Sequence, residues 1–349
     1  MRYRLLGSTG LRISPLALGT MTFGQKEWGT DEDTARAIFR AYFEWGGNFV
    51  DTADGYGGGR SEELVGAFVK ETGSRDHVVL ATKYSGATRP GEPNAAGNGR
   101  KNLLRSLDAS LRRLQTDHVD LYWMHFWDTL TPVEEVMSTL DALVRSGKVL
   151  AVGLSDVPAW YFAKAQMLAD RHGWEPVAAL QLEYSLVERH IEREHLPAAA
   201  EFGTELVPWS PLASGFLTGK YTRGEGTAAT GDGRLGAIAD APFMRRRTER
   251  DWAVLDTLTA VAGEIGGTPA QVAINWTANR PGVASPLIGA RDVHQLEANL
   301  AALDLALTEE QAARLEEAGR PELYQPYILF DPDVIGRLST PGFRLHPIT

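Results

Sequence analysis

The sequence places four side chains that can hold or move a proton beside short apolar runs. Asp51, Lys83 and His125 each follow such a run, and Tyr56 lies in the loop beyond Asp51. Short apolar runs bounded by turn residues predict buried strands. In a parallel α/β barrel, the carboxyl ends of the strands carry the active site. We therefore expect a carboxylate, a phenol, an ammonium and an imidazole to meet at one rim.

Together these four groups could deliver a proton to a carbonyl oxygen. A phenol has an ordinary pKa of about 10, and a nearby ammonium lowers that pKa because it stabilises the phenolate. Lys83 can act on Tyr56 in this way, and Asp51 would keep Lys83 charged and in place. His125 could donate to the oxygen that Tyr56 protonates. The site can supply a proton but no electrons, so a reduction needs a hydride donor bound beside it.

The length and composition are those of an ordinary globular protein. The chain has 349 residues, of which 43% are hydrophobic and 23% are charged. A rule of about 150 residues per domain suggests two domains, but α/β barrels commonly exceed roughly 250 residues as one domain. We expect residues 1–349 to form a single barrel domain.

The acidic balance and the absence of cysteine narrow the classes of function. A net charge of −10 and a pI near 5.4 disfavour nucleic acid and anionic membranes as partners, since most of the surface would repel them. Without cysteine there are no disulfides, thiolate nucleophiles or cysteine-bound metals. No apolar segment approaches the roughly 18 residues of a membrane helix. We expect a soluble, cytoplasmic protein that acts on a small molecule, and the sequence does not indicate its oligomeric state.

Alternating strand and helix patterns predict an α/β fold of the (β/α)8 TIM-barrel type. Strand-like runs end near Thr20, Thr52, Thr82, Met124, Ser155, Glu183, Pro208 and Gly289. Amphipathic segments fill most of the gaps, and we expect helices over Asp31–Trp45, Ser61–Lys70 and Thr131–Ser146. In the last of these, Thr131 and Glu134 have the spacing of a capping box. Such alternation is typical of βαβ units around a parallel sheet.

Three segments depart from this repeat. Residues 1–15, around Gly7-Ser8-Thr9-Gly10, predict an N-terminal β-hairpin that could cap the barrel floor. Residues 219–247 are Gly-rich and too long for an ordinary loop, so we expect a lid or a disordered segment there. Residues 319–349, with Tyr324, Tyr327, Phe330 and Phe343, form a C-terminal tail that we expect to wrap the surface.

The sequence offers no Rossmann site for the hydride donor. No G-x-G-x-x-G motif follows a strand, and Gly57-Gly58-Gly59 breaks that spacing. Polar candidates lie later in the chain and are Ser155, Gln181, Trp209 to Leu212 with Lys220, and Gly289-Ala290-Arg291 before the helix that starts near Asp292. Barrels often bind phosphate where the loops after strands seven and eight meet a helix amino terminus. A dinucleotide bound there would face the four proton-transfer residues.

Over nearly its whole length the chain resembles the aldo-keto reductase family. The motifs that carry the resemblance occur in the family's order and are Gly19-Thr20-Met21-Thr22-Phe23-Gly24, Asp51-Thr52-Ala53-x-x-Tyr56-Gly57, Lys83, His125, Gly153-Leu154-Ser155, Gln181-x-x-Tyr184-Ser185-Leu186-x-x-Arg189, Pro208-Trp209-Ser210-Pro211-Leu212 and Gly215-Phe216-Leu217-Thr218-Gly219-Lys220. Chance agreement on all of them is negligible. The resemblance implies a (β/α)8 barrel that reduces a carbonyl group with a nicotinamide cofactor, usually NADPH.

The resemblance also implies which residues are catalytic and which bind the cofactor. Tyr56 would be the general acid, tuned by Lys83 and Asp51. His125 would orient the carbonyl. The residues that would bind NADPH or NADP+ are Gly19, Thr20, Met21, Asp51, Ser155, Asp156, Gln181, Trp209, Ser210, Pro211, Leu212, Gly215, Leu217, Lys220, Gly289, Ala290, Arg291, Gln295 and Asn299.

Within this set the resemblance distributes the cofactor along the rim. Trp209 would stack on the nicotinamide, and Ser155 and Gln181 would hold its carboxamide. Lys220 and the main chain of residues 212–219 would contact the pyrophosphate. Arg291, with Gln295 and Asn299, would bind the adenosine part of the cofactor. A guanidinium there could pair with a 2′-phosphate, so we expect NADPH to be preferred and NADH to bind more weakly.

Two positions depart from the family's pattern. Asp156 stands where the family usually has asparagine, and an ionised aspartate can accept from a carboxamide but cannot donate to it. Ala298 stands where a glutamate or similar polar group often reaches the adenine. Cofactor affinity would then be lower than is typical of the family.

Aromatic residues near the expected mouth suggest walls for a substrate ring. They are Phe23, Trp28, Tyr84, Phe126 and Trp127, and such side chains stack on a ring or a sugar face. For Phe23 and Phe126, ordinary packing around the rim explains their presence nearly as well. An aldehyde, a ketone or a keto-sugar would each fit.

Two other classes of function stay open on the sequence alone. Some family members bind cofactor but serve as regulatory or redox-sensing subunits with little turnover, as the potassium-channel beta subunits do. A barrel glycosidase would need two carboxylates, for which Asp51 and Glu183 are the candidates.

The run Arg245-Arg246-Arg247 has two interpretations: it is a solvated charge run, or it contacts phosphate from the lid. His190 and His195 are off a single helical face, so we expect no metal site.

Overall fold

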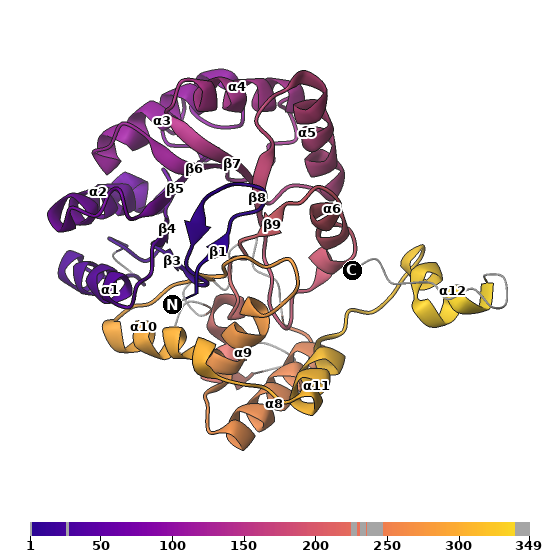
Figure 1. The fold of residues 1–349 in the computed structure, drawn as a ribbon. Coiled ribbons are helices and arrows are strands. Elements are labelled where there is room, and N and C mark those ends of the chain that lie inside the picture. The colour runs from indigo at the N-terminus through magenta and orange to yellow at the C-terminus, as the bar shows by residue number, and fades with distance from the viewer. Residues whose placement is uncertain (1, 26–27, 225–228, 231–234, 236–246, 339–349) are drawn as a thin grey trace.

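The core of the protein is an eight-stranded parallel sheet curled into a barrel (Figure 1). The computed structural model describes residues 2–25, 28–224, 229–230, 235 and 247–338. The barrel strands are β3 (Ala17–Gly19), β4 (Phe49–Asp51), β5 (Val79–Tyr84), β6 (Val119–Met124), β7 (Val149–Ser155), β8 (Val177–Gln181), β9 (Glu205–Leu206) and β12 (Leu287–Ile288). Each ends within two residues of its expected position, so the predicted (β/α)8 fold is confirmed.

Hydrogen bonds on both sides of β12 close the ring. The strands follow the order β12-β3-β4-β5-β6-β7-β8-β9, and Leu287 pairs with Ala17 of β3. On the other side, the amide of Leu206 donates to the carbonyl of Gly282, and the amide of Leu287 donates to the carbonyl of Pro208, each at 2.8 Å. The carboxyl ends of all the strands therefore meet at one rim.

Side-chain parity decides what each strand contributes to the inside of the barrel. In β6, Leu121 and Trp123 belong to the inner cluster of buried residues, whereas Tyr122 and Met124 pack toward the helices. The indole of Trp123 fills the space beside Gly153 of β7, where an added Cβ would lie 2.2 Å from the ring. A glycine is therefore required at that position of β7.

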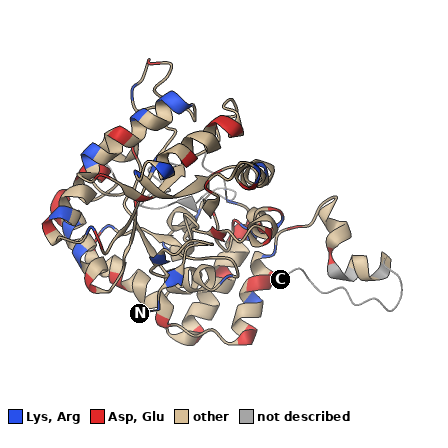
Figure 2. Ribbon diagram, turned by 45° about the horizontal axis from the view of Figure 1, so that its top comes forward, with Lys and Arg blue, Asp and Glu red and all other residues tan. Residues whose placement is uncertain are grey.

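Helices surround the barrel in the expected alternation (Figure 1). They are α1 (Glu32–Glu44), α2 (Arg60–Thr72), α3 (Arg100–Leu114), α4 (Val133–Arg145), α5 (Ala159–His172), α6 (His195–Glu201), α8 (Glu249–Ile265), α9 (Pro269–Ala278), α10 (Val293–Leu300) and α11 (Glu309–Gly319). Short 3-10 turns add η1 (Tyr56–Gly59), η2 (His190–Glu192), η3 (Ala213–Thr218) and η4 (Ala301–Asp304). Charged residues lie mostly on the outer helices and loops, with both signs interspersed (Figure 2).

The expected start of α1 is confirmed, and the expected capping box of α4 is wrong. Asp31 caps α1 by accepting from the amide of Thr34 at 2.8 Å. Helix α4 instead begins after Pro132, without a side-chain cap. The Thr131 hydroxyl donates to Asp128 at 2.6 Å, and Glu134 pairs with Lys164 at 2.7 Å. Thr131 therefore bonds to the preceding loop and Glu134 forms an ion pair, so neither side chain takes part in a capping box.

The N-terminal hairpin is present and closes the floor of the barrel. Strands β1 (Arg4–Leu5) and β2 (Arg12–Ile13) pair antiparallel, and Figure 1 shows the hairpin across the centre of the ring. Leu6 and Ile13 are fully buried in the inner cluster. The Arg4 guanidinium donates to the carbonyls of Ala278 and Val283 at 2.9 and 3.0 Å. The hairpin thus covers the end of the barrel opposite the carboxyl rim.

The two remaining segments are described in part. Most of residues 219–247 lie outside the described residues. The described part of this segment includes two short strands, β10 (Thr222–Arg223) and β11 (Ala229–Thr230). The tail contacts the barrel through Tyr324, whose ring centroid lies 4.3 Å from the guanidinium carbon of Arg193. Beyond it, η5 (Tyr327–Phe330) leads to α12 (Pro332–Leu338), which stands away from the barrel in Figure 1. The expectation that the tail wraps the surface is therefore wrong for α12, and Phe343 lies outside the described residues. No described helix is long and apolar enough to cross a membrane.

Candidate active site

Adjacent strands bring the carboxylate, the ammonium and the phenol together. Asp51 shares the inward face of β4 with Phe49, and Lys83 shares the inward face of β5 with Ala81. Asp51 and Lys83 are both buried, and Lys83 Nζ donates to the Asp51 carboxylate. The same ammonium donates to the Tyr56 hydroxyl at 3.3 Å. The expected contact between these three side chains is therefore made.

The ammonium is held from several sides and stays charged. Lys83 Nζ also donates to the carbonyl of Thr52 at 2.8 Å. The second oxygen of Asp51 accepts from Gln181 Nε2 at 3.1 Å. Burial alone would lower the pKa of Lys83, but the charge of Asp51 and the contacts with Asp51 and Tyr56 outweigh it, and the pKa is raised. The ion pair is buried, but its hydrogen-bonding groups are satisfied.

The imidazole of His125 completes the group of four. His125 continues the inward parity of Leu121 and Trp123, and its amide donates to the carbonyl of Tyr84 at 2.9 Å. Its ring meets the Tyr56 ring edge-on, with 5.8 Å between the centroids. Burial and the nearby charge of Lys83 lower the pKa of His125 to about 3. The imidazole is therefore neutral at physiological pH and can donate or accept one hydrogen bond.

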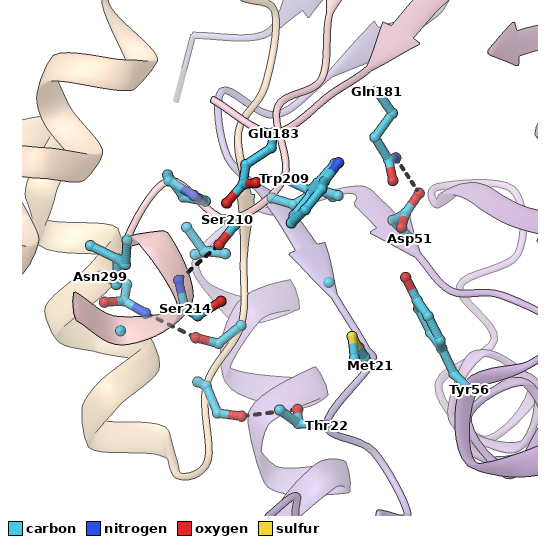
Figure 3. A pocket seen from close by; sticks show the side chains of 18 of the residues that line it. Met21, Thr22, Asp51, Tyr56, Gln181, Glu183, Trp209, Ser210, Ser214 and Asn299 are labelled. Carbon is cyan, nitrogen blue, oxygen red and sulfur yellow. Dashed lines mark hydrogen bonds between the residues drawn. The ribbon is translucent and has the colours of Figure 1, made fainter. Parts of the chain in front are cut away.

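Three of the four residues, Asp51, Tyr56 and His125, line one cavity at the carboxyl rim, and Lys83 is fully buried beside them. The cavity has a volume of about 810 Å³. Figure 3 shows Asp51, Gln181 and Tyr56 on one side, and Ser210, Ser214 and Asn299 on the other. Of the residues expected to bind cofactor, those that line it are Gly19, Met21, Asp51, Ser155, Asp156, Gln181, Trp209, Ser210, Pro211, Leu212, Gly215, Lys220, Gly289, Ala290, Arg291, Gln295 and Asn299. The rim therefore gathers segments that are far apart in the sequence.

Thr20 and Leu217 are not among the residues that line the cavity, and their side chains are buried. Thr20 follows Gly19 and so points outward, where its hydroxyl donates to the carbonyl of Asp51 at 3.0 Å and meets the Ser61 hydroxyl at 2.9 Å. Leu217 is fully buried in the layer between the barrel and the helices. Both residues support the rim from behind.

Two of the five aromatic residues expected at the mouth line the cavity. Trp28 and Phe126 line the cavity. Phe23 is fully buried against Phe68, with ring centroids 6.3 Å apart. Tyr84 follows Lys83 and therefore points outward, where it stacks on Tyr122. Trp127 packs on Trp160 and Tyr161. None of these three rings lines the cavity.

Beside the group of four, the wall offers polar groups that a bound molecule could use. Ser155 Oγ is buried and has no hydrogen-bond partner among the described residues. Asp156 follows it with a φ of 44°, and its Oδ1 accepts from Trp209 Nε1 at 3.0 Å. Burial raises the pKa of Asp156 to about 6. An amide group of a bound molecule could satisfy Ser155.

The far half of the cavity suits an anion. Ser210, Ala213, Ser214 and Gly215 have φ values of 58°, 50°, 57° and 90°, so the chain turns tightly here. The amides of Ala213 and Gly215 donate to the carbonyls of Ser210 and Leu212 within the turn. The amide of Ser214 donates to Ser210 Oγ at 2.9 Å. Lys220 and Arg247 line the same part of the cavity. Arg247 is the described member of the three-arginine run, and Arg245 and Arg246 lie outside the described residues.

The last part of the rim is built by the amino-terminal end of α10. Asp292 caps this helix by accepting from the amide of Gln295. Gln295 Oε1 in turn accepts from the amide of Arg291 at 2.8 Å, and Asn299 Nδ2 donates to the carbonyl of Gly289 at 3.1 Å. Arg291 is thereby held at the cavity edge with an exposed side chain.

Several lining residues were not expected from the sequence. Thr22, Glu188, Ser214, Thr218, Leu287 and Ile288 also line the cavity. All of them lie within or beside the segments already singled out, so proximity to those segments was the available signal.

Comparisons with known proteins agree with this geometry. The model of the aldo/keto reductase family matches residues 15–320. The chain is 37% identical over 318 residues to norsolorinic acid reductase of Emericella nidulans, covering 88% of this chain and 79% of that one. It is 36% identical over 345 residues to an aryl-alcohol dehydrogenase (NADP+) of Phanerodontia chrysosporium, covering 94% and 89%. It is 39% identical over 318 residues to an uncharacterized oxidoreductase of Bacillus subtilis, covering 89% and 93%.

The barrel and its rim define a carbonyl-reducing oxidoreductase that depends on NAD(P)H. The chain belongs to the aldo/keto reductase family. The glycosidase alternative is not supported, because the chain belongs to a family of reductases and Asp51 is engaged in an ion pair with Lys83.

We predict that His125 stays neutral between pH 5 and 8. Folding lowers its pKa from an ordinary value of about 6.5 to about 3. Its contribution to stability is therefore complete above about pH 6.5 and is lost as the pH falls toward 3. The Cε1–H NMR signal of His125, assigned by its loss in His125→Asn, should keep the shift of a neutral imidazole throughout. A titration midpoint near pH 6.5 would contradict this environment.

Proposed function

We propose that this protein reduces an aldehyde or ketone on an aromatic substrate, with NADPH as the hydride donor and Tyr56 as the general acid. The observation that carries the proposal is the contact of Tyr56 with the buried Lys83–Asp51 pair at one end of a long cavity. Two aromatic side chains, Trp28 and Phe126, line the same cavity. The relatives whose names refer to aryl alcohols support an aromatic substrate.

The proton-transfer residues have distinct tasks in this proposal. Tyr56 gives its phenolic proton to the carbonyl oxygen, and the Lys83 ammonium stabilises the phenolate that remains. The neutral imidazole of His125 donates a hydrogen bond to the same oxygen and orients the carbonyl. Asp51 touches no substrate and positions Lys83.

The cavity wall fits a nicotinamide dinucleotide. Such a cofactor supplies the hydride when it is bound. Ser155 Oγ would bond its carboxamide, and the indole of Trp209 would pack on its ring. Lys220, which lines the cavity beside the turn at Ser210 to Gly215, would hold the pyrophosphate. Arg291 would meet the 2′-phosphate and adenine.

We predict that the purified protein oxidises NADPH in the presence of aromatic aldehydes and that Tyr56→Phe removes most of this activity. Only the phenolic proton is lost, and general-acid catalysis is typically worth about 10²–10⁴-fold. Turnover should fall by about that factor, while the NADPH dissociation constant stays nearly unchanged. Absorbance at the NADPH band and a fluorescence titration measure the two quantities.

The contrary results separate the alternatives. Tight NADPH binding without turnover across a broad panel of aldehydes, ketones and keto-sugars would favour the regulatory or redox-sensing subunit. Unchanged turnover in Tyr56→Phe would mean that another group supplies the proton. Failure to bind either cofactor would contradict the proposed function as a whole.

We predict that Arg291→Ala weakens NADPH binding much more than NADH binding. A hydrogen bond to a charged group is worth about 1.5–3 kcal/mol, so the NADPH dissociation constant should rise at least roughly tenfold. Arg320→Ala is a matched control, because Arg320 is an exposed arginine that pairs with Glu317 on α11 and does not line the cavity. Parallel titrations with both cofactors measure the effect. Equal losses for NADPH and NADH in Arg291→Ala would refute the 2′-phosphate contact.

A further inference from the structure

We propose that the Asp156 carboxylate makes this cavity favour the oxidised, positively charged nicotinamide over the reduced, neutral one. The inference rests on the proposed function, because it takes a nicotinamide cofactor as the occupant of the cavity. It concerns a single lining residue that the proton-transfer chemistry does not use.

The fold holds Asp156 rigidly at the cavity wall. The residue follows the last position of β7, its amide donates to the carbonyl of Gln181 at 3.1 Å, and its carbonyl accepts from the amide of Trp127 at 3.3 Å. These two bonds tie it to β8 on one side and to the loop after β6 on the other. Its φ of 44° is left-handed, a conformation that aspartate and asparagine tolerate better than most residues. The backbone therefore fixes where the carboxylate stands.

The carboxylate itself is oriented by the indole next to it. Asp156 Oδ1 accepts from Trp209 Nε1 at 3.0 Å, and both residues line the cavity. This bond uses one oxygen and leaves the other for a second contact. Asp156 is exposed at the cavity wall, and loss of part of the water around its carboxylate raises the pKa to about 6, so the group is ionised at pH 8. A fixed negative charge thus lies beside the indole on the cavity wall.

The chemistry requires the nicotinamide ring to lie near this charge. A nicotinamide that delivers its hydride to the carbon whose oxygen Tyr56 protonates would have to bind in the cavity close to Tyr56. Along that wall, the unpartnered Ser155 Oγ is the group that a carboxamide would satisfy, and Asp156 is the next residue. The cation that acts on Asp156 is Lys83, whose charge is already paired with Asp51. The Asp156 charge is therefore available to the ring.

A nearby carboxylate distinguishes the two redox states by charge alone. The oxidised ring carries a positive charge that the reduced ring lacks, and an opposite charge within a few ångströms stabilises a charged form. In alcohol oxidation, the carbinol C–H bond breaks and its hydride passes to the oxidised ring, while the O–H proton passes to the Tyr56 phenolate. The products are the carbonyl compound, the reduced cofactor and protonated Tyr56. By stabilising the oxidised ring, Asp156 shifts the equilibrium on the protein toward bound oxidised cofactor and alcohol.

The test compares the two cofactor forms in Asp156→Asn. Asparagine removes the charge, keeps an oxygen that accepts from Trp209, and suits the same backbone conformation. Dissociation constants for NADP+ and NADPH are measured at pH 8 by calorimetric titration of the full-length protein, without substrate. We expect the NADP+ constant to rise about tenfold relative to the NADPH constant, the lower end of what an adjacent charge produces. The melting temperature without cofactor should stay close to that of the wild type.

Asp108→Asn is the matched control, since it removes an exposed carboxylate that pairs with Lys148 and does not line the cavity. Its ratio of the two constants should change less than about twofold, because the interaction between charges weakens with distance and in water. An unchanged ratio in Asp156→Asn, or an equal change in Asp108→Asn, would overturn the role of Asp156 while leaving the proposed function intact. Wild-type protein that binds neither cofactor would overturn both.

Discussion

The buried ion pair of Asp51 and Lys83 is the interaction on which the site depends. Moving two charges out of water costs several kcal/mol per ion, and breaking such a pair by removing one partner costs about 3–5 kcal/mol. In this protein the cost is offset because Lys83 also bonds the carbonyl of Thr52, and Asp51 also bonds Gln181. The pair fixes the ammonium against the hydroxyl of Tyr56.

The barrel makes this placement possible through parity and closure. Parallel pairing of β4 with β5 sets Asp51 beside Ala81, two residues before Lys83, with both charged side chains on the inward face. The same parity carries His125 and Gln181 to the rim from β6 and β8. Closure through β12 then sets Gly289 and Arg291 opposite them. One end of the cavity can handle protons, and the other end can handle anions.

Much of this arrangement follows from the sequence, and the failures have a common cause. Apolar runs located every barrel strand, and the chemistry of Asp51, Lys83 and His125 at their ends predicted a shared rim. The family resemblance implied a cofactor contact for Thr20, and Tyr84 was expected among the aromatic residues at the mouth, but successive side chains of a strand point to opposite faces. Thr20 follows the inward-facing Gly19 and Tyr84 follows the inward-facing Lys83, so alternation along each strand predicts that both side chains point outward. Tertiary contacts such as the bond between Asp156 and Trp209, and the course of α12, leave no signal in a single sequence.

The coupling between Tyr56 and Lys83 is the property that tests the role of the buried ion pair most directly. Carbonyl-reduction rates are measured for the wild type, Tyr56→Phe, Lys83→Met and the double variant. If Lys83 acts through the Tyr56 oxygen, the double variant should lose little more activity than Tyr56→Phe alone. Once the Tyr56 hydroxyl is absent, the Lys83 ammonium has no phenolate to stabilise. Losses that multiply independently would show that Lys83 does not act on Tyr56, and would contradict a role of the ion pair in proton transfer.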